Sequence, residues 1–208
     1  MLRQRDDMRV SEIFESLQGE GPLMGKPMLF VRLSGCNLSC PWCDTKYAQD
    51  TYEEMDIGDV VSSIEDSDLD YVCWTGGEPL LQMDDMIEAI KRVPQKGHCL
   101  ETNGTLRIPK GLFTSVVVSP KTLEKKPPDN ADAYKFVVDA NDTEELTRIA
   151  EYASRHSIER KKIYIQPMCT EVEEALKANA MIWGECVRYG FSLSPRLHIL
   201  FFGHKRCV

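Results

Sequence analysis

Three cysteines within one eight-residue run are the residues of this chain with the clearest chemical potential. Cys36, Cys40 and Cys43 have the spacing C-x3-C-x2-C, and no fourth cysteine follows at a short, regular distance. A structural zinc site or an electron-transfer iron–sulfur cluster normally requires four protein ligands. Three thiolates on one loop can instead hold a four-iron cluster with one iron open to a small molecule. The alternative is a structural loop of buried or disulfide-bonded cysteines.

Further candidate residues follow predicted strands. The strand predicted at 70–74 leads into T-G-G-E-P at 75–79, where two glycines allow close approach of a ligand and Glu78 adds a carboxylate. Other polar sequences after predicted strands are E-T-N-G (101–104), S-P-K (119–121) and Q-P-M (166–168). Each alone is also compatible with an ordinary turn. Because ligands of parallel sheets collect at the carboxyl ends of the strands, we expect these motifs to contribute to one site.

The elements that would position these motifs alternate between strand and helix. Short β-branched or apolar runs predict strands at 10–14, 28–33, 70–74, 98–102, 115–118, 134–138 and 163–166. Helical spacing predicts helices at 57–64, 83–93, from a cap at 141–143 to about 156, and 171–188, and the tail 197–202 is predicted as a last extended segment. Strands separated by helices imply an α/β fold with a parallel sheet. The six strands between 28 and 166 are too few to close an eight-stranded barrel.

Length and composition limit the possible functions. The 208 residues favour one domain, and a hydrophobic content of 42% is sufficient for a core. A net charge of −8 disfavours a protein that coats nucleic acid, because no basic excess can neutralise phosphates. We find no signal peptide or membrane-spanning run, and the cysteine content then favours a reducing cytoplasm. Five cysteines outside the run are expected to be small core residues: Cys73, Cys99, Cys169, Cys186 and Cys207.

The cysteine run resembles the cluster loop of the radical S-adenosylmethionine enzymes. An apolar segment leads into S-G-C at 34–36, and Trp42 precedes the last cysteine, where that superfamily usually has an aromatic residue. The T-G-G-E-P sequence resembles the superfamily's motif for the amino group of S-adenosylmethionine. The resemblance implies a partial, open TIM-like barrel and a 4Fe-4S cluster held by Cys36, Cys40 and Cys43. In this superfamily, the open iron chelates S-adenosylmethionine, and one electron cleaves it to a 5′-deoxyadenosyl radical.

The N-terminal sequence narrows the resemblance to one family. The pattern E-x-F-x-S-x-Q-G-E-G at 12–21 is similar to that of the 7-carboxy-7-deazaguanine synthases. The same family resemblance extends to F-V-R-L-S-G-C (30–36), W-C-D-T (42–45), E-T-N-G-T (101–105), S-P-K (119–121), L-H (197–198) and G-H-K-R (203–206). It therefore covers essentially the whole chain. Some family members carry a long insertion between the first two cysteines, which this chain lacks.

This resemblance implies a specific reaction. The family converts 6-carboxy-5,6,7,8-tetrahydropterin to 7-carboxy-7-deazaguanine, the deazapurine base of queuosine and archaeosine. The radical abstracts hydrogen from the carbon that bears the carboxylate, the ring contracts, ammonia leaves and S-adenosylmethionine is regenerated. The implied enzyme is a carbon–nitrogen lyase that requires a 4Fe-4S cluster, S-adenosylmethionine and Mg²⁺, with no catalytic side chain beyond the cofactor-bound radical.

Residue roles follow from the family's motifs. The implied contacts of S-adenosylmethionine are Trp42, Asp44, Gly77, Glu78, Glu101, Ser119, Lys121, Gln166 and Met168. The implied contacts of the substrate are Leu17, Gln18, Gly19, Arg32 and Thr75. Arg32 offers a fork suited to the substrate carboxylate, with a surface ion pair as the alternative. The Thr45 hydroxyl is implied as a magnesium ligand, with a helix N-cap or turn hydroxyl as the alternative.

The resemblance also implies an organisation and a set of partners. We expect one radical-enzyme domain over 1–208, with a substrate-binding extension at 9–25 and a C-terminal cover at 171–208. A homodimer is implied, and the apolar residues of the predicted helix at 171–188 favour it. An external reductant of the flavodoxin or ferredoxin type is expected, with no nucleic-acid or membrane partner.

Two other functions remain open. An activase of a glycyl-radical protein is similarly short and shares the apolar-Ser-Gly-Cys approach to the cluster. It should lack Q-G-E-G at 18–21, and it requires a large protein partner. A non-enzymatic iron–sulfur electron carrier would need a fourth ligand and no cofactor pocket. Formation of 5′-deoxyadenosine with and without the pterin separates the three functions.

Overall fold

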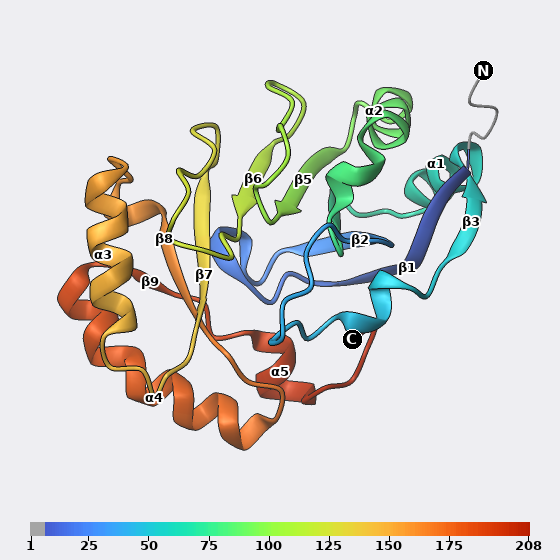
Figure 1. Ribbon diagram of the computed structural model, residues 1–208. Coiled ribbons are helices and arrows are strands. Elements are labelled where there is room, and N and C mark those ends of the chain that lie inside the picture. Colours follow the sequence, from blue (N-terminus) through green and yellow to red (C-terminus); the bar gives the residue numbers. More distant parts are fainter. Residues whose placement is uncertain (1–6) are drawn as a thin grey trace. The chain divides into compact units, whose positions relative to one another are not determined.

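A computed structural model describes the chain from residue 7 to residue 208 (Figure 1). These residues form two compact units, and the chain passes between them several times. Unit 1 comprises the described part of Met1–Ser16, together with Pro27–Thr102 and Leu106–Ser115; unit 2 comprises Leu17–Lys26, Asn103–Thr105 and Val116–Val208. The single domain expected over 1–208 stays a prediction, as do the boundaries of the N-terminal extension and the C-terminal cover.

Unit 1 is built on strands in the order β3-β1-β2-β4-β5. Their bounds are β1 (Asp7–Leu17), β2 (Pro27–Leu33), β3 (Glu53–Asp56), β4 (Tyr71–Gly76) and β5 (Gly97–Thr102). β2, β4 and β5 run parallel, whereas β3 pairs antiparallel with β1. The sequence pattern does not predict β3, because its residues E-E-M-D show no apolar alternation. Their charges suit an exposed strand at the edge of a sheet.

The core of unit 1 follows the alternation of its strands. Val31, Leu33, Trp74 and Leu100 are fully buried on one face. Helices α1 (Ile57–Glu65) and α2 (Met83–Arg92) pack against each other (Figure 1). Each helix buries a stripe of apolar residues and leaves most of its charged residues exposed. The opposite face of the strands carries polar residues near the carboxyl ends.

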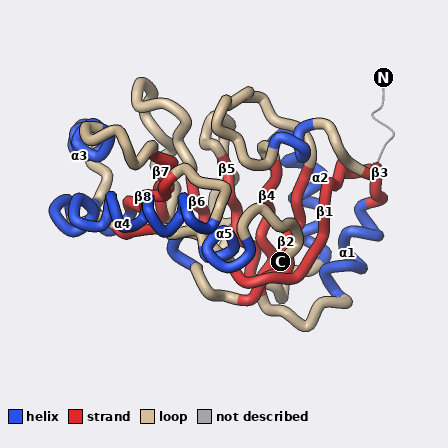
Figure 2. The backbone as a smooth tube through the Cα atoms, turned by 90° about the horizontal axis from the view of Figure 1, so that it is seen from below, coloured by secondary structure: helices blue, strands red, loops and turns tan. Residues whose placement is uncertain are grey.

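Unit 2 holds parallel strands in the order β6-β7-β8-β9. The strands are β6 (Ser115–Val118), β7 (Ala133–Val138), β8 (Ile163–Pro167) and β9 (Ser192–Leu193), and the helices are α3 (Glu145–Arg155), α4 (Val172–Tyr189) and α5 (Leu197–Phe202). Figure 2 shows α3 and α4 beside β7 and β8, and α4 contacts β8, α3 and α5. Ile199 of α5 is buried against Ala175 of α4 and Cys169.

The predicted strands and helices of the sheet-forming region are confirmed to within a few residues, with two differences. The tail at 197–202 is helix α5, so its prediction as an extended segment is wrong. Arg196 precedes it with a left-handed φ of 61°, Gly203 ends it, and a six-residue apolar run cannot by itself distinguish strand from helix. Helix α3 begins at Glu145 without a side-chain cap, later than predicted, because Asp142 accepts a bond from Glu144 N in the preceding turn. No helix within 7–208 has the length and apolarity needed to cross a membrane.

Candidate active site

The cysteine loop follows β2 and presents three accessible thiols. Cys36, Cys40 and Cys43 are partly exposed, and all eight cysteines are free thiols. Cys73, Cys99, Cys169 and Cys186, by contrast, are buried as small core residues, whereas Cys207 is exposed, so its prediction as a core residue is wrong. The interpretation of the run as buried or disulfide-bonded is therefore wrong. Within residues 7–208, no three metal-ligating side chains converge as they would around a single metal ion. Free, accessible thiols on one loop are nevertheless the donor set that a cluster requires.

The loop is fixed in place by the glycine turn that follows β4. Gly77 N donates to Leu33 O at 3.1 Å, and Glu78 N donates to Gly35 O at 2.8 Å. A Cβ on Gly76 would lie 1.9 Å from Leu33 O, and one on Gly77 would lie 2.2 Å from Gly35 O. Gly76 also has a left-handed φ of 142°. Both glycines are therefore needed for backbone to pack on backbone, and the structure brings the two motifs of the sequence together.

Glu78 has a different environment from the one that the motif suggests. Its side chain is fully buried, and Oε1 accepts hydrogen bonds from Leu80 N at 3.1 Å and Thr102 Oγ1 at 2.8 Å. It thereby caps the 3₁₀ helix η3 (Pro79–Gln82). These contacts assign the carboxylate a structural role here. Contact with S-adenosylmethionine stays a prediction for Glu78, as it does for the partly exposed Glu101.

Arg32 and Thr75, two predicted substrate residues, are register partners on β2 and β4. Arg32 Nε donates to Glu12 Oε2 at 2.9 Å, and Tyr47 Oη donates to the same oxygen at 3.0 Å. The guanidinium lies over the ring of Phe14, with Cζ 5.8 Å from the ring centre. Arg32 is therefore not a surface side chain, although it forms an ion pair. Glu12 and Tyr47 are functional candidates that the sequence reasoning missed.

The electrostatic environment of Arg32 keeps it charged. Burial lowers the pKa of the guanidinium, but Tyr47, Glu12 and Cys73 together outweigh burial and raise the pKa above its ordinary value. A permanently charged, planar side chain at the carboxyl end of a parallel strand is suited to bind a carboxylate. The sequence did contain one signal for Glu12. In the E-x-F pattern, Glu12 lies two residues before Phe14, so both side chains lie on the same face of the strand.

The residues that flank the last cysteine of the run lie at or near the surface. Trp42 and Asp44 are exposed. Thr45 stands at the N-cap position of the 3₁₀ helix η2 (Lys46–Gln49) but forms no side-chain cap; its hydroxyl donates to Asp44 Oδ1 at 2.7 Å. The proposed magnesium ligand therefore lies beside a carboxylate oxygen. Hard cations favour such oxygen donors, although the metal role stays a prediction.

In unit 2, the Q-G-E-G segment is tied to the start of α5. Leu197 N donates to Gly19 O at 2.9 Å, and a Cβ on Gly19 would lie 2.3 Å from His198 Nδ1. Any side chain at Gly19 would collide with the imidazole, which explains the glycine. Gln18 is buried and accepts from Glu20 N at 3.1 Å, whereas the neighbouring Leu17 is 55% exposed.

Glu20 is the centre of a buried charge network that the sequence reasoning missed. It forms ion pairs with Lys135 and with Arg196 Nε, the latter at 3.1 Å, and both cations are almost fully buried. His198 Nε2 lies 3.8 Å from the same carboxylate. Burial raises the pKa of Glu20, but Lys135, Arg196 and His198 outweigh burial and hold the pKa well below its ordinary value. The signal for Lys135 was a charged residue within the apolar run A-Y-K-F-V-V.

The remaining predicted cofactor residues lie at strand ends of unit 2. Lys121 Nζ donates to Ser119 Oγ at 2.8 Å, directly after β6. Gln166 is buried at the end of β8, where Ser194 Oγ donates to its Oε1 at 3.3 Å, and Met168 is 41% exposed. The carboxyl-end placement predicted for these motifs is confirmed within the unit, whereas their contact with a ligand stays a prediction.

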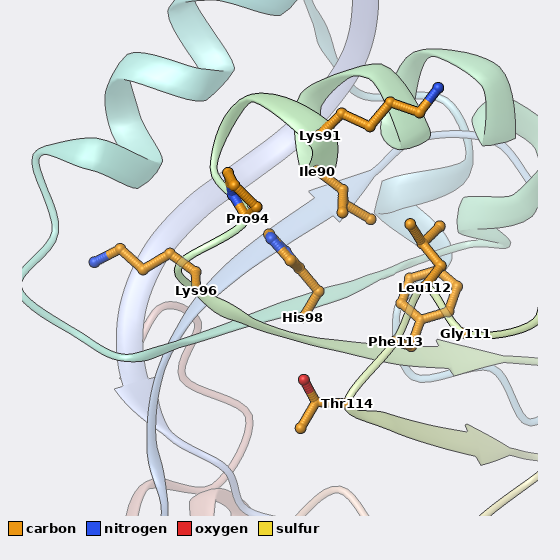
Figure 3. Close-up of a pocket in the computed structure, with 9 residues that line it drawn as sticks. All are labelled: Ile90, Lys91, Pro94, Lys96, His98, Gly111, Leu112, Phe113 and Thr114. Carbon is orange, nitrogen blue, oxygen red and sulfur yellow. The ribbon is translucent and has the colours of Figure 1, made fainter.

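Unit 1 contains a cavity of about 350 Å³ at the end of β5 opposite to the E-T-N-G motif (Figure 3). It is lined near the amino-terminal end of β5 by His98 and Thr114, and the side chains of Lys91 and Lys96 point away from it. Burial lowers the pKa of His98, whose Nδ1 accepts a hydrogen bond from Trp74 Nε1 at 3.1 Å. A neutral, hydrogen-bonded histidine at the opposite strand end is part of the core and not of the candidate site.

Comparisons with known proteins indicate the same family that the motifs resemble. The Radical SAM superfamily model matches residues 30–179. The 7-carboxy-7-deazaguanine synthase of Hyperthermus butylicus is 36% identical, over 93% of this chain and 92% of its own length. That of Pyrobaculum aerophilum is also 36% identical, over 96% of each chain. The crystal structure of QueE from Escherichia coli has a TM-score of 0.69 and 22% identity, and the match covers 91% of this chain and 93% of that one.

The structural likeness confirms the fold class, an α/β partial barrel with a mostly parallel, open sheet. The superfamily match, in turn, identifies an enzyme type that uses a 4Fe-4S cluster and S-adenosylmethionine. The two relatives named above match nearly the full length of the chain at 36% identity. This chain therefore belongs to the 7-carboxy-7-deazaguanine synthase family of the radical S-adenosylmethionine superfamily.

Proposed function

We propose that this protein converts 6-carboxy-5,6,7,8-tetrahydropterin to 7-carboxy-7-deazaguanine with loss of ammonia. The observation that carries the substrate assignment is the charged guanidinium of Arg32, which is the register partner of Thr75 at the carboxyl end of β2. A planar fork at this position suits the substrate carboxylate. Leu17, Gln18 and Gly19 are proposed to contact the rest of the substrate.

Cys36, Cys40 and Cys43 are proposed to hold the cluster. When bound, the cluster and S-adenosylmethionine supply the one-electron chemistry that generates the adenosyl radical. The protein contributes an anchored loop, because the Gly76–Gly77 turn packs directly on the backbone that leads into Cys36. Its thiols are partly exposed, which allows the cluster to be inserted into the folded chain.

The cofactor-binding role is divided among the strand ends. The proposed contacts of S-adenosylmethionine are Trp42, Asp44, Gly77, Glu78, Glu101, Ser119, Lys121, Gln166 and Met168. The exposed Trp42 and Asp44 and the paired Ser119 and Lys121 offer donors and acceptors without breaking a core contact. Glu78 would contribute through its backbone, since its side chain is engaged by the protein.

Thr45 is proposed as a ligand of Mg²⁺. Its hydroxyl already lies 2.7 Å from Asp44 Oδ1, so one hard oxygen donor is held beside another. The direct check is an activity titration with magnesium in wild-type protein and in Thr45→Ala. Activity that responds to the metal in wild type and loses that response in the variant supports the role, and a response unchanged by the substitution contradicts it.

A homodimer is proposed from the outer face of α4. Leu176, Trp183 and Val187 are 60%, 64% and 72% exposed and lie on one helical stripe. Glu173 and Arg188 flank opposite ends of this stripe, so an antiparallel pairing with a second copy brings unlike charges together. Light scattering should give about twice the chain mass of 23.7 kDa, and Trp183→Glu should shift it to the monomer. A monomeric mass for the wild type contradicts the dimer.

The test of the function is turnover by anaerobically reconstituted protein with a flavodoxin- or ferredoxin-type reductant. We expect 7-carboxy-7-deazaguanine to form from the carboxypterin, with S-adenosylmethionine required but not consumed in proportion. An activase would show no pterin-dependent product, and an electron carrier would not cleave the cofactor.

Replacement of Cys36, Cys40 or Cys43 by Ala should abolish the cluster chromophore, whereas the same change at the buried Cys73 or Cys99 should not. Loss of the chromophore in a buried-cysteine variant would contradict the assignment.

A further inference from the structure

We infer that Glu12 and Tyr47 are positioning residues that orient the guanidinium of Arg32, so that its free Nη edge meets the substrate carboxylate. This inference rests on the proposed function, which assigns that carboxylate to Arg32. It adds two residues from separate parts of unit 1, the strand β1 and the 3₁₀ helix η2, to the recognition of the substrate.

One carboxylate oxygen fixes the position of the arginine. Glu12 Oε2 accepts from Arg32 Nε at 2.9 Å and from Tyr47 Oη at 3.0 Å, so the acceptor is itself held by a second donor. The exposed fractions of the Arg32 and Glu12 side chains are only 17% and 7%. An ion pair that is largely removed from water is stronger and less mobile than one on the surface.

An aromatic stack supports the guanidinium from one side. Arg32 Cζ lies 5.8 Å from the centre of the Phe14 ring, and this ring is stacked on Phe30 with centres 5.2 Å apart. A cation over a fixed aromatic face gains from the ring quadrupole and loses freedom to rotate. The Nε edge and one face of the guanidinium are therefore both determined by the protein.

The Nη edge is the part of Arg32 left for a ligand. Within residues 7–208, the hydrogen bond of Arg32 uses Nε, and its two Nη atoms have no protein partner. Among the same residues, the buried side-chain nitrogen and oxygen atoms without a partner are His156 Nε2 and Asn179 Oδ1. The Nη atoms of Arg32 are not among these buried atoms, so they reach solvent. Their parallel N–H groups can donate to both oxygens of a carboxylate.

The positioning role has an electrostatic consequence as well. Because Glu12 offsets the charge of Arg32, the pair presents little net charge to a ligand, and recognition depends on the orientation of the N–H groups. A guanidinium that rotates away from this orientation loses the bidentate contact while it keeps its charge. The positioning residues should thus affect substrate affinity much more than cleavage of the cofactor without substrate.

The experiment compares Glu12→Ala, Glu12→Gln and the matched control Glu15→Ala. Glu15 is a carboxylate on the same strand, and it accepts from Ser67 Oγ at 2.6 Å instead of from Arg32. Glu12→Ala should raise the KM for the carboxypterin about tenfold and leave uncoupled formation of 5′-deoxyadenosine unchanged. Glu12→Gln keeps a neutral acceptor for Nε and should restore most of the loss. Glu15→Ala should have the KM of the wild type.

A double-mutant cycle with Arg32→Ala separates the possible failures. In the Arg32→Ala background, Glu12→Ala should cause no further rise in KM, because nothing remains to be positioned. An Arg32→Ala variant with wild-type KM would overturn the carboxylate assignment of the proposed function. A raised KM in Arg32→Ala together with a wild-type KM in Glu12→Ala would overturn the positioning inference alone. If Glu12→Ala does not fold, Tyr47→Phe replaces it with an expected rise of roughly two- to fivefold, and an unchanged KM overturns the inference.

Discussion

Glu12 in unit 1 and Glu20 in unit 2 are both largely buried carboxylates paired with cations, yet their surroundings differ. Glu12 accepts hydrogen bonds from the guanidinium of Arg32 and the phenol of Tyr47, and that guanidinium keeps a solvent-facing edge. Glu20 contacts two almost fully buried cations, with His198 nearby. The pair of Glu12 and Arg32, the open pair, is arranged to receive a ligand. The network of Glu20, Lys135 and Arg196, the closed network, holds β7 and the segment before α5 to the Q-G-E-G turn. We therefore expect its loss to affect mainly stability.

The largest expected effect is therefore loss of the closed network. Glu20→Ala leaves Lys135 and Arg196 buried without this carboxylate, and we expect the free energy of unfolding to fall by about 3–5 kcal/mol. Denaturant unfolding of the variant and the wild type measures the difference. Glu12→Ala is the comparison and should cost less, because the Nη edge of Arg32 already reaches solvent. Equal losses for the two variants would remove the distinction between the open and closed sites.

A second prediction concerns the contact between Gly19 and His198. A Cβ at Gly19 would lie 2.3 Å from His198 Nδ1, so Gly19→Ala should lower the free energy of unfolding by about 1–3 kcal/mol through overpacking. In a His198→Ala background, the same substitution should cost much less, since the imidazole is gone. Unfolding measurements on the four proteins of this cycle test the contact. An equal cost in both backgrounds would place the strain elsewhere.

The third prediction is a pH dependence of stability that belongs to the closed network. The pKa of Glu20 in the folded protein is depressed below the ordinary value of 4.5. Above pH 4.5, the ionised carboxylate therefore makes its full contribution to the free energy of unfolding. As the pH falls below 4.5, the unfolded chain takes up the proton first, and the contribution is lost at no more than about 1.4 kcal/mol per pH unit. Unfolding free energies measured over this acidic range should depend less on pH in Glu20→Gln. An identical slope in the variant would contradict the depressed pKa.

The comparison also shows what the sequence can reveal. The cysteine loop and the glycine turn were predictable because short local patterns specify their chemistry. The turn has room for glycine only, since a Cβ on Gly76 would lie 1.9 Å from Leu33 O. The strands were predictable from apolar periodicity, whereas the short tail 197–202 was not, since its helix depends on the left-handed backbone of Arg196. Local sequence patterns therefore predict secondary-structure elements and motifs better than they predict which residues those elements contact.

The partners of charged residues depend on contacts that are distant in sequence. Arg196 meets Glu20 across 176 positions of the chain, and Tyr47 meets Glu12 across 35. No local spacing reveals such pairs, although a lysine within the apolar strand β7 is a sign that a buried anion is needed. The candidate residue Arg32 was predictable from its motif, but the residues that orient it required the folded structure.

The central claim is that the Nη edge of Arg32 receives the substrate carboxylate, and Arg32→Lys tests it most directly. A lysine keeps the charge and can still pair with Glu12, so the variant should fold and keep most of the contribution of this ion pair to the free energy of unfolding. It has no planar fork, so the KM for the carboxypterin should rise about ten- to a hundredfold, while uncoupled cleavage of S-adenosylmethionine continues. A variant of wild-type stability with an unchanged KM would contradict the claim.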